Sequence, residues 1–188
     1  MNGPAGTAAG TGTTPGTGTT MRVRPVTEDD LEALATIDAG YASTHTVEAI
    51  VSAASTRFFA RSGHSFVAER VDTKGNEACV GFVFAHAVWR GDRAAVQTAR
   101  LAVAEDAGTG PAEALVAALT KSAYDSGVYD LTVAPPTGDA RLAEVLERAT
   151  FHVVDVVTFA RALGSRGAAG GSETAAEVVR PARGDGHA

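Results

Sequence analysis

Hydrophobic and polar positions along the first half of the chain follow two periods, one typical of strands and one typical of helices. After a first strand, the pattern predicts two helices that end at Gly40 and Gly63. Two strands then flank the polar loop 72–77, which predicts a β-hairpin. The elements expected in this half are a strand at 22–26, a helix capped by Thr27, a helix with its apolar face from Val47 to Phe58, and strands at 65–71 and 79–89.

The second half continues this pattern and adds a β-α-β unit. Its long helix is predicted to end at Gly127, and Pro135 and Pro136 break the strand that follows. The order βααβββαβαβ predicts an α/β fold (α+β by some schemes), with a mixed, mostly antiparallel twisted sheet and four helices. The elements expected in this half are strand 94–103, helix 111–126, strand 129–134, helix 139–149 and strand 151–163.

Both ends of the chain lack this pattern. Residues 1–20 consist almost wholly of Gly, Thr, Ala and Pro, and residues 164–188 are mainly Gly, Ala, Ser and charged residues. Neither segment carries enough apolar surface to offset the entropy lost on ordering, so we expect two disordered tails around one domain at 21–163. Met21 is either the true start of the protein or the end of a flexible leader with a function of its own.

Composition narrows the class of protein. The formal net charge of −6 disfavours nucleic acid and anionic membrane as partners. Cys79 is the only cysteine, which excludes an internal disulfide, and no apolar run reaches the ~20 residues of a membrane helix. We therefore expect a cytoplasmic protein without a secretory signal. The histidines show no metal-ligand spacing, so no metal is expected, and there is no dinucleotide fingerprint or phosphate loop.

Four motifs fall in the order and at the distances that one superfamily shows. They are Val80-Gly81-Phe82, Leu101-Ala102-Val103, Gly110-Pro111-Ala112, and the spacing from Asp139 to Phe151, which is similar to N-x-x-A-x-x-L-Y-x-x-x-G-F with Asp in place of the Asn. Together with the order of elements, these motifs make the domain resemble the GNAT superfamily of acyl-coenzyme A (acyl-CoA)-dependent N-acyltransferases. Segments 58–66, 87–89 and 121–129 are also similar to a small, functionally uncharacterised bacterial GNAT-like family.

The GNAT resemblance implies acetyl-CoA or another acyl-CoA as cosubstrate. It also implies an amine, on a small molecule or on a protein, as acceptor. Backbone N–H groups beyond Val103 would polarise the thioester carbonyl, and the loop at 108–112 would hold the pyrophosphate at a helix N-terminus. The cofactor-binding residues implied in this way are Leu101, Val103, Gly108, Thr109, Gly110 and Ala112.

The pyrophosphate loop departs from the family's pattern. Ala107 stands where the family has Arg or Gln, and Pro111 lacks an N–H that could meet a phosphate. Three carboxylates surround the loop, and no Lys or Arg lies between positions 101 and 120. We expect binding of CoA to be weakened rather than abolished. The same residues also make a good helix start without any ligand.

The family's acid and base are replaced as well. Leu146 stands at the place of the tyrosine that protonates the thiolate. Tyr124 is the substitute acid that we name, with Tyr129 as its alternative, although either is also an ordinary core or rim aromatic. His86 is the substitute base, with Glu69 or an ordered water as alternatives. As a half-buried strand histidine, His86 also needs no catalytic role.

Two hypotheses follow from the sequence. In the first, the chain is a GNAT-like N-acyltransferase with degenerate catalytic motifs. In the second, it is a non-catalytic GNAT-fold module that binds a ligand or a protein, with a homodimer as one form it can take. The fold alone does not choose between them, because function belongs to the site.

Overall fold

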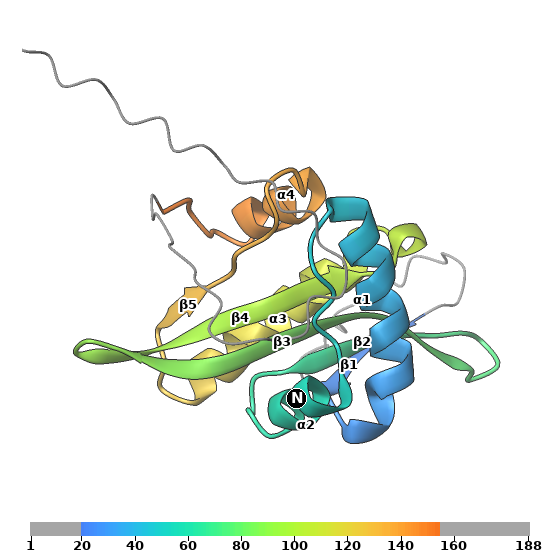
Figure 1. Cartoon of the computed structure of the whole chain (residues 1–188), viewed down its shortest axis with the longest axis horizontal. Coiled ribbons are helices and arrows are strands. Elements are labelled where there is room, and N and C mark those ends of the chain that lie inside the picture. Colours follow the sequence, from blue (N-terminus) through green and yellow to red (C-terminus); the bar gives the residue numbers. More distant parts are fainter. Residues whose placement is uncertain (1–19, 155–188) are drawn as a thin grey trace, which may run out of the picture. The chain divides into compact units, whose positions relative to one another are not determined.

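The computed structural model describes residues 20–154, which form a five-stranded sheet with helices on both faces (Figure 1). Neighbouring strands in the sheet are also neighbours in the chain, in the order β1-β2-β3-β4-β5. The first four strands are antiparallel and β5 is parallel to β4, which confirms the mixed, mostly antiparallel sheet predicted above. The strands are β1 (Thr20–Pro25), β2 (Phe66–Val71), β3 (Glu77–Arg90), β4 (Arg93–Val103) and β5 (Asp130–Thr132).

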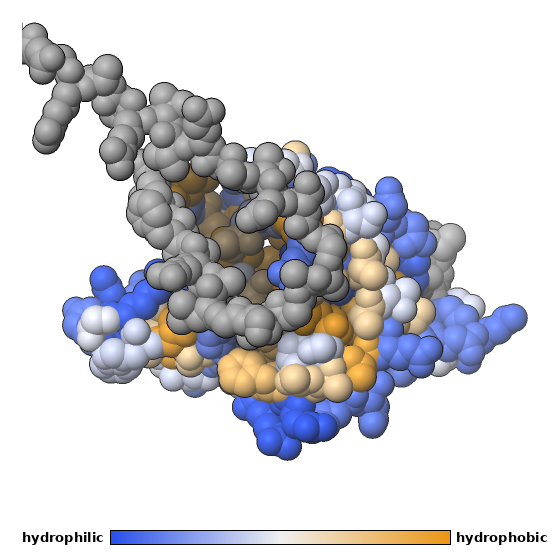
Figure 2. Space-filling model, in the orientation of Figure 1, coloured by the Kyte–Doolittle hydropathy of each residue, from blue (hydrophilic) through white to orange (hydrophobic). Residues whose placement is uncertain are grey.

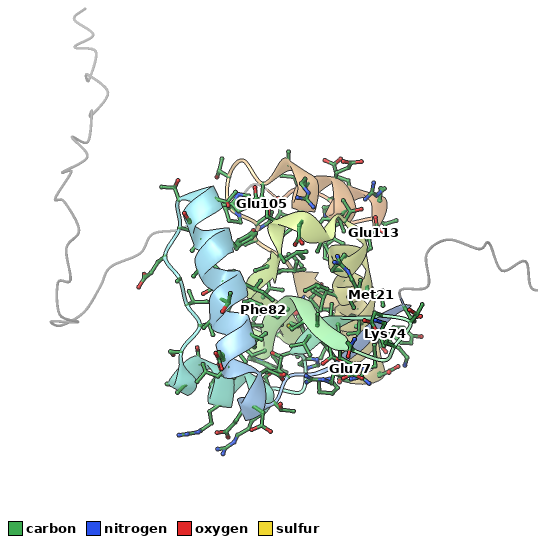
Figure 3. All side chains as sticks on the ribbon, turned by 90° about the vertical axis from the view of Figure 1, so that its right-hand side faces the viewer. Met21, Lys74, Glu77, Phe82, Glu105 and Glu113 are labelled. Carbon is green, nitrogen blue, oxygen red and sulfur yellow. The ribbon has the colours of Figure 1, made fainter. Side chains whose placement is uncertain are left out.

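Two groups of helices cover the two faces of the sheet. One face packs against α1 and α2, and Phe82 of β3 lies in this core beside α1 (Figure 3). The other face packs against α3, and α4 adds Leu142 and Val145 to that second core. The helices are α1 (Leu31–His45), entered through the short 3-10 turn Glu28–Asp30, α2 (Ala53–Ala60), α3 (Gly110–Asp125) and α4 (Ala140–Arg148).

The predicted end of the first helix at Gly40 is wrong. Gly40 lies inside α1, which continues to His45 and is followed by Thr46 in a left-handed conformation with φ 53°. One glycine costs a helix only about 1 kcal/mol relative to alanine. The buried side chains of Ile37 and Tyr41, on either side of Gly40, hold the helix against the sheet.

The second helix begins later than its apolar pattern predicts. It starts at Ala53 rather than near Val47, and the residues between them form a loop. Asp38 of α1 holds this loop, because its Oδ2 accepts the N–H groups of Ile50 and Val51 at 2.5 and 2.9 Å. These N–H groups therefore find their partners in a distant carboxylate instead of in a helix.

The buried face of α2 and the last predicted strand also differ from expectation. Phe58 is 57% exposed, and Phe59 is buried in its place, stacked on Phe84 with ring centroids 4.5 Å apart. The shorter helix turns a different face to the sheet than the longer predicted one. Residues 151–154 belong to no strand, and the rest of the predicted strand 151–163 lies outside the described residues, as do 1–19 and the tail at 164–188.

β4 carries a bulge that reverses the alternation of its side chains. Thr98 and Arg100 pair with successive residues of β3, so Ala99 between them is an extra residue. Val96 before the bulge and Leu101 after it belong to the same core, the one formed with α3. An even and an odd position thus share one face of the sheet, which happens only when the strand gains a residue.

Candidate functional site

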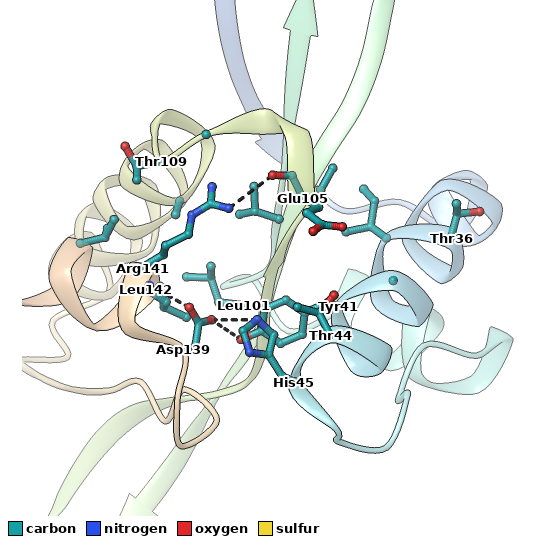
Figure 4. A pocket seen from close by; sticks show the side chains of 17 residues that line it. Thr36, Tyr41, Thr44, His45, Leu101, Glu105, Thr109, Asp139, Arg141 and Leu142 are labelled. Carbon is teal, nitrogen blue, oxygen red and sulfur yellow. Dashed lines mark hydrogen bonds and ion pairs between the residues drawn. The ribbon is translucent and has the colours of Figure 1, made fainter.

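A recess opens where β5 leaves β4. The two strands pair only along Ala95–Gln97 of β4, and within residues 20–154 no strand pairs with that edge at 98–103. α1, α4 and the loop 104–109 complete the walls of a cavity of about 460 Å³. Hydrophobic residues are visible deep between α4 and α1 in Figure 2, and Figure 4 shows the side chains that line the cavity.

The structure brings together the residues that the GNAT resemblance assigns to CoA. Five of the six line the recess, and the sixth, Gly110, is the first residue of α3 beside them. They come from the edge of β4, the following loop and the first turn of α3. The five are Leu101, Val103, Gly108, Thr109 and Ala112.

Free backbone donors gather at the start of α3. Four N–H groups there donate to no acceptor within residues 20–154. The chain turns toward them through Gly108, whose φ of 73° favours glycine. Such donors at a helix N-terminus attract anions. The four groups belong to Gly108, Thr109, Gly110 and Ala112.

N–H groups also face the recess along the unpaired edge of β4, as far as Val103. The Ala104 N–H, directly after Val103, already donates to the Val80 carbonyl at 2.9 Å. Alternate residues of an antiparallel strand point their N–H and C=O groups away from the paired strand. The unpaired edge at 98–103 therefore offers backbone donors to a carbonyl group bound in the recess.

Arg141 on α4 brings to the recess a positive charge that the loop itself lacks. Its Nη1 donates to the carbonyl oxygen of Glu105 at 3.3 Å (Figure 4). Arg148 of the same helix pairs with Glu113, Nη2 to Oε1 at 2.7 Å, and offsets one of the carboxylates beside the loop. The surroundings of the loop are thus less negative than the segment 101–120 alone indicates.

Asp139 organises a polar cluster between α1 and α4. Its Oδ1 accepts the Leu142 N–H at 3.0 Å, and its Oδ2 accepts the Tyr41 hydroxyl at 2.7 Å. His45 Nε2 lies 3.6 Å from the same Oδ2, and the rings of His45 and Tyr41 have centroids 4.4 Å apart (Figure 4). Burial, and then the hydrogen bond to Asp139, raise the pKa of Tyr41 far above that of an ordinary phenol. Tyr41 therefore stays a neutral donor.

A buried ion pair supports this cluster from the side of the sheet. Arg100 Nε lies 3.0 Å from Asp38 Oδ1, and the Arg100 guanidinium lies 5.4 Å from the centre of the Tyr41 ring. Arg100 also donates to the carbonyl oxygen of Glu48. Removing one member of such a pair leaves the other charge buried alone, which is strongly destabilising. The pair thus fixes α1 and its Tyr41 against β4.

Neither His86 nor Tyr124, the predicted base and acid, lines the recess. His86 packs against Phe58 and Phe59 of α2 with ring centroids 5.8 and 5.9 Å away, and its buried Nδ1 has no partner within the described part of the chain. Tyr124 is 67% exposed in the last turn of α3 and contacts Tyr129. Since α3 begins at the recess, Tyr124 lies roughly 20 Å along the helix from it.

The alternatives weighed for acid and base are engaged elsewhere. Glu69 accepts Arg22 Nη2 at 2.6 Å and Arg24 Nε at 2.8 Å, on the strands away from the recess. Tyr129, the alternative acid, is 79% exposed and contacts Tyr124. Leu146, at the place of the family's tyrosine, is buried in the core formed with α3. The titratable groups that do meet at the recess are Tyr41, His45, Glu105, Asp139 and Arg141.

Sequence reasoning missed Tyr41, His45 and Arg141. One local signal was available, because residues four apart on a helix share a face and Tyr41 and His45 are so spaced. Nothing local marks Arg141, which reaches the recess only because α4 packs against the start of α3.

Open space lies in front of α1 at Gly40, where the helix faces the recess. A Cβ placed on Gly40 would meet no atom within 4 Å, and this glycine does not adopt a positive φ. Thr36 and Thr44, one turn before and after it, also line the recess. Neither conformation nor packing demands glycine here, although glycine weakens a helix. Its effect is to leave space in front of α1.

Other chemistries find less support in the described residues. Within 20–154, no group of three or more His, Cys, Asp or Glu side chains is arranged to hold a metal ion. Burial raises the pKa of the Cys79 thiol, which leaves it a poor nucleophile. In the same part of the chain, no helix has the length and apolarity needed to cross a membrane.

Comparison with known proteins gives a family and a fold. A family model described as "Protein of unknown function (DUF1999)" matches residues 21–176. Crystal structures of TTHA1254 from Thermus thermophilus, as wild type and as a mutant, are 34% and 35% identical to this chain with TM-scores of 0.61 and 0.64. Each match covers 77% of this chain and 99% of the other. A search of curated proteins finds no match.

More distant structures share the fold and carry names of acetyltransferases. A ribosomal-protein-alanine N-acetyltransferase from Brucella melitensis biovar Abortus 2308 is 17% identical, with a TM-score of 0.55. An aminoglycoside acetyltransferase, HMB0005, from an uncultured soil metagenomic sample is 19% identical, with a TM-score of 0.57. The first match covers 78% of this chain and the second 77%, and each covers 99% of the other chain. The fold is therefore GNAT-like, as the sequence predicts.

Proposed function

This chain belongs to the family of unknown function DUF1999, and we propose that it is a GNAT-like, acyl-CoA-dependent N-acyltransferase. The observation that carries the proposal is the recess beside the unpaired edge of β4, which ends at the free N–H groups of α3. Acyl-CoA has a long arm of methylene groups and two amides that ends in phosphates. A groove with apolar walls and an anion-binding end matches both parts of such a molecule.

In the proposed reaction, a neutral amine attacks the thioester carbonyl carbon. A C–N bond forms, the C–S bond breaks, and one proton moves from the nitrogen to the sulfur, so that an amide and the CoA thiol are released. Backbone N–H groups at 98–103 donate to the carbonyl oxygen, where negative charge develops. Leu101 and Val103 pack against the arm of the cosubstrate.

The phosphates lie at the start of α3 in this proposal. The free N–H groups at 108–112 donate to the pyrophosphate, and the helix dipole favours its charge. Arg141 supplies the cation that the loop lacks. Glu105 and Asp106 remain close by, so binding is weaker than at a loop that carries its own Arg.

The acceptor is an amine on a small molecule or on a protein. The names of two fold neighbours mention one acceptor of each kind, a ribosomal protein alanine and an aminoglycoside. We also propose that the protein works in the cytoplasm without nucleic acid or membrane partners, on the basis of its acidic charge and single cysteine.

A second candidate function is supported by the replaced catalytic positions. Leu146 is buried where the resemblance places a tyrosine, and His86 and Tyr124 do not line the recess. These features suit a GNAT-fold module that binds a ligand, or a second copy of itself, without transferring an acyl group. The two candidates differ in turnover rather than in binding.

Calorimetric titration of the full chain with acetyl-CoA tests the proposal. We expect saturable binding with a Kd at or below about 1 mM. Thr109 precedes α3 without using its side chain as a cap. Thr109→Asp should therefore keep or improve the helix start while repelling the phosphates, which weakens binding about tenfold. Thr109→Asn, a neutral cap of similar size, is the matched control and should bind like the wild type.

No saturable binding at that concentration would refute the enzyme proposal. Binding by the wild type without release of the CoA thiol, over a panel of small amines and peptides, would favour the binding module instead. Equal affinity of the Asp and Asn variants would place the phosphates away from α3.

A further inference from the structure

We propose that His45 is the proton relay of this site, the group that takes the proton from the amine and returns it to the sulfur, and that Asp139 and Tyr41 hold it in position. This inference rests on the proposed function. It concerns the identity of the residues that move the proton, since the positions expected for that task hold Leu146, His86 and Tyr124. Those residues are buried in the core or lie away from the recess.

The relay lies where the recess meets a second cavity. The recess that receives the cosubstrate has Tyr41, His45 and Asp139 in its wall. The second cavity, of about 200 Å³, shares Tyr41 with the recess and extends past the β4 bulge to the segment 133–136. An acyl donor in the recess and an amine in the second cavity would meet at Tyr41, next to His45.

His45 has the chemistry that the task requires. It is the only imidazole among the described side chains that line the recess, and imidazole is the side chain that most often serves enzymes as both general base and general acid. Nε2 faces Asp139 at 3.6 Å, and within residues 20–154 Nδ1 has no hydrogen-bond partner. One nitrogen is thus oriented by a carboxylate while the other is free for substrate, as in nucleophile–base–carboxylate sites generally.

Asp139 and Tyr41 are positioning residues. Asp139 cannot swing away from His45, because Oδ1 is held by the Leu142 N–H and Oδ2 by the Tyr41 hydroxyl. Tyr41 is fixed in turn by the Arg100–Asp38 ion pair behind its ring. An imidazolium at His45 would lie 3.6 Å from Asp139 Oδ2, which is within ion-pair distance.

The charges around His45 come from each element packed on it. α1 contributes the neutral Tyr41 hydroxyl and, behind it, Asp38 paired with Arg100 of β4. The start of α4 contributes Asp139, and Arg141 follows farther along the recess beside Glu105. The carboxylate nearest to His45 is therefore Asp139, and the nearest cation is already paired.

The proton balance is closed within the site. As the amine nitrogen bonds to the carbonyl carbon, it passes one proton to His45 Nδ1. When the C–S bond breaks, the imidazolium returns that proton to the thiolate sulfur. His45 ends as it began, and no separate acid is needed at the place of Leu146.

Ionisation of the CoA thiol tests the relay without an acceptor. The thiolate absorbs in the far ultraviolet and the thiol does not, so its titration can be followed for free CoA and for CoA saturated with the full chain. At pH 7 we expect ionisation of bound CoA to shift toward the thiolate, with a thiolate fraction about tenfold that of free CoA, because His45 can take the thiol proton and the imidazolium so formed stabilises the thiolate. In His45→Gln, the bound thiol should ionise at or above the pKa of free CoA.

Two measurements distinguish loss of the proton relay from loss of the fold. Asp139→Asn keeps a good helix cap and should give a shift between those of the wild type and His45→Gln. Far-ultraviolet circular dichroism without CoA should give the same spectrum for all three proteins, which shows that the fold is intact.

A wild-type shift that persists in His45→Gln would overturn the relay and leave the proposed function standing. Binding of CoA with no shift in the wild type would overturn it as well. No binding of CoA by the wild type would instead overturn the proposed function itself.

Discussion

Gly40 gives the sharpest test of whether a ligand occupies the recess. Gly40→Ala adds one methyl group with no atom within 4 Å of it and restricts the unfolded chain. Because glycine weakens a helix interior by roughly 0.5–1 kcal/mol relative to alanine, we expect the free energy of unfolding to rise by that amount. For a chain of this size, the rise in Tm is roughly 1–4 °C.

Gly40→Leu fills the same space with a larger side chain. The leucine enters a hollow rather than a packed core, so the free energy of unfolding should stay within about 1 kcal/mol of the wild type. A ligand in the recess would have to compete with it. We therefore expect acetyl-CoA to bind at least about tenfold more weakly, a loss of about 1.4 kcal/mol.

The assay combines thermal unfolding by circular dichroism with calorimetric titration by acetyl-CoA. Ala39→Leu is the matched control, since Ala39 is exposed on the same helix and does not line the recess. It should keep the affinity of the wild type. Equal affinities of Gly40→Leu and Ala39→Leu would refute the reasoning, and so would a Gly40→Ala protein less stable than the wild type.

Three further predictions concern the folded state. Asp38→Asn leaves Arg100 buried without its counter-ion, so we expect urea denaturation at pH 7 to show a loss of about 3–5 kcal/mol, against less than about 0.5 for the exposed control Glu32→Gln. Gly81→Ala places a Cβ 3.1 Å from the Ala102 carbonyl oxygen and should cost roughly 1–3 kcal/mol in the same assay, whereas an unchanged midpoint would show that the strands yield. Burial lowers the pKa of His64 below its usual value near 6.5. In the folded state His64 therefore binds its proton only at lower pH, and stability should fall as pH drops from about 6.5 through the folded pKa. His64→Gln should flatten this part of the pH–stability curve, and an unchanged slope would contradict the assignment.

The sequence was informative wherever structure depends on near neighbours. Strand alternation and helix periods located the sheet and α3, because these patterns report which side chains are buried within one element. The Gly-rich start of α3 was visible for the same reason. The residues from 101 to 112 that line the recess are close in the chain, so motif spacing predicted them as a group.

The sequence was uninformative where the hydrogen-bond or ion-pair partner of a residue comes from a distant segment of the chain. Residues 47–52 have an apolar helical period, yet they form a loop, because backbone N–H groups of this segment donate to the Asp38 carboxylate. Tyr41 and Asp139 are 98 positions apart, and their hydrogen bond exists only because α1 and α4 flank the same edge of β4. Arg141 offsets charge beside a loop more than thirty residues away for the same reason.

The extra residue in β4 makes its bulge a determinant of the recess. Deleting Ala99 would return β4 to simple alternation, and Arg100 and Leu101 would keep their faces, because Thr98 and Arg100 already pair with successive residues of β3. The strand would lose the bend and the added twist of the bulge, which lie directly after Gln97, where the pairing of β4 with β5 ends. One deletion in the middle of β4 would therefore let β5 pair farther along this edge and close the recess, while the ion pair behind Tyr41 stays in place.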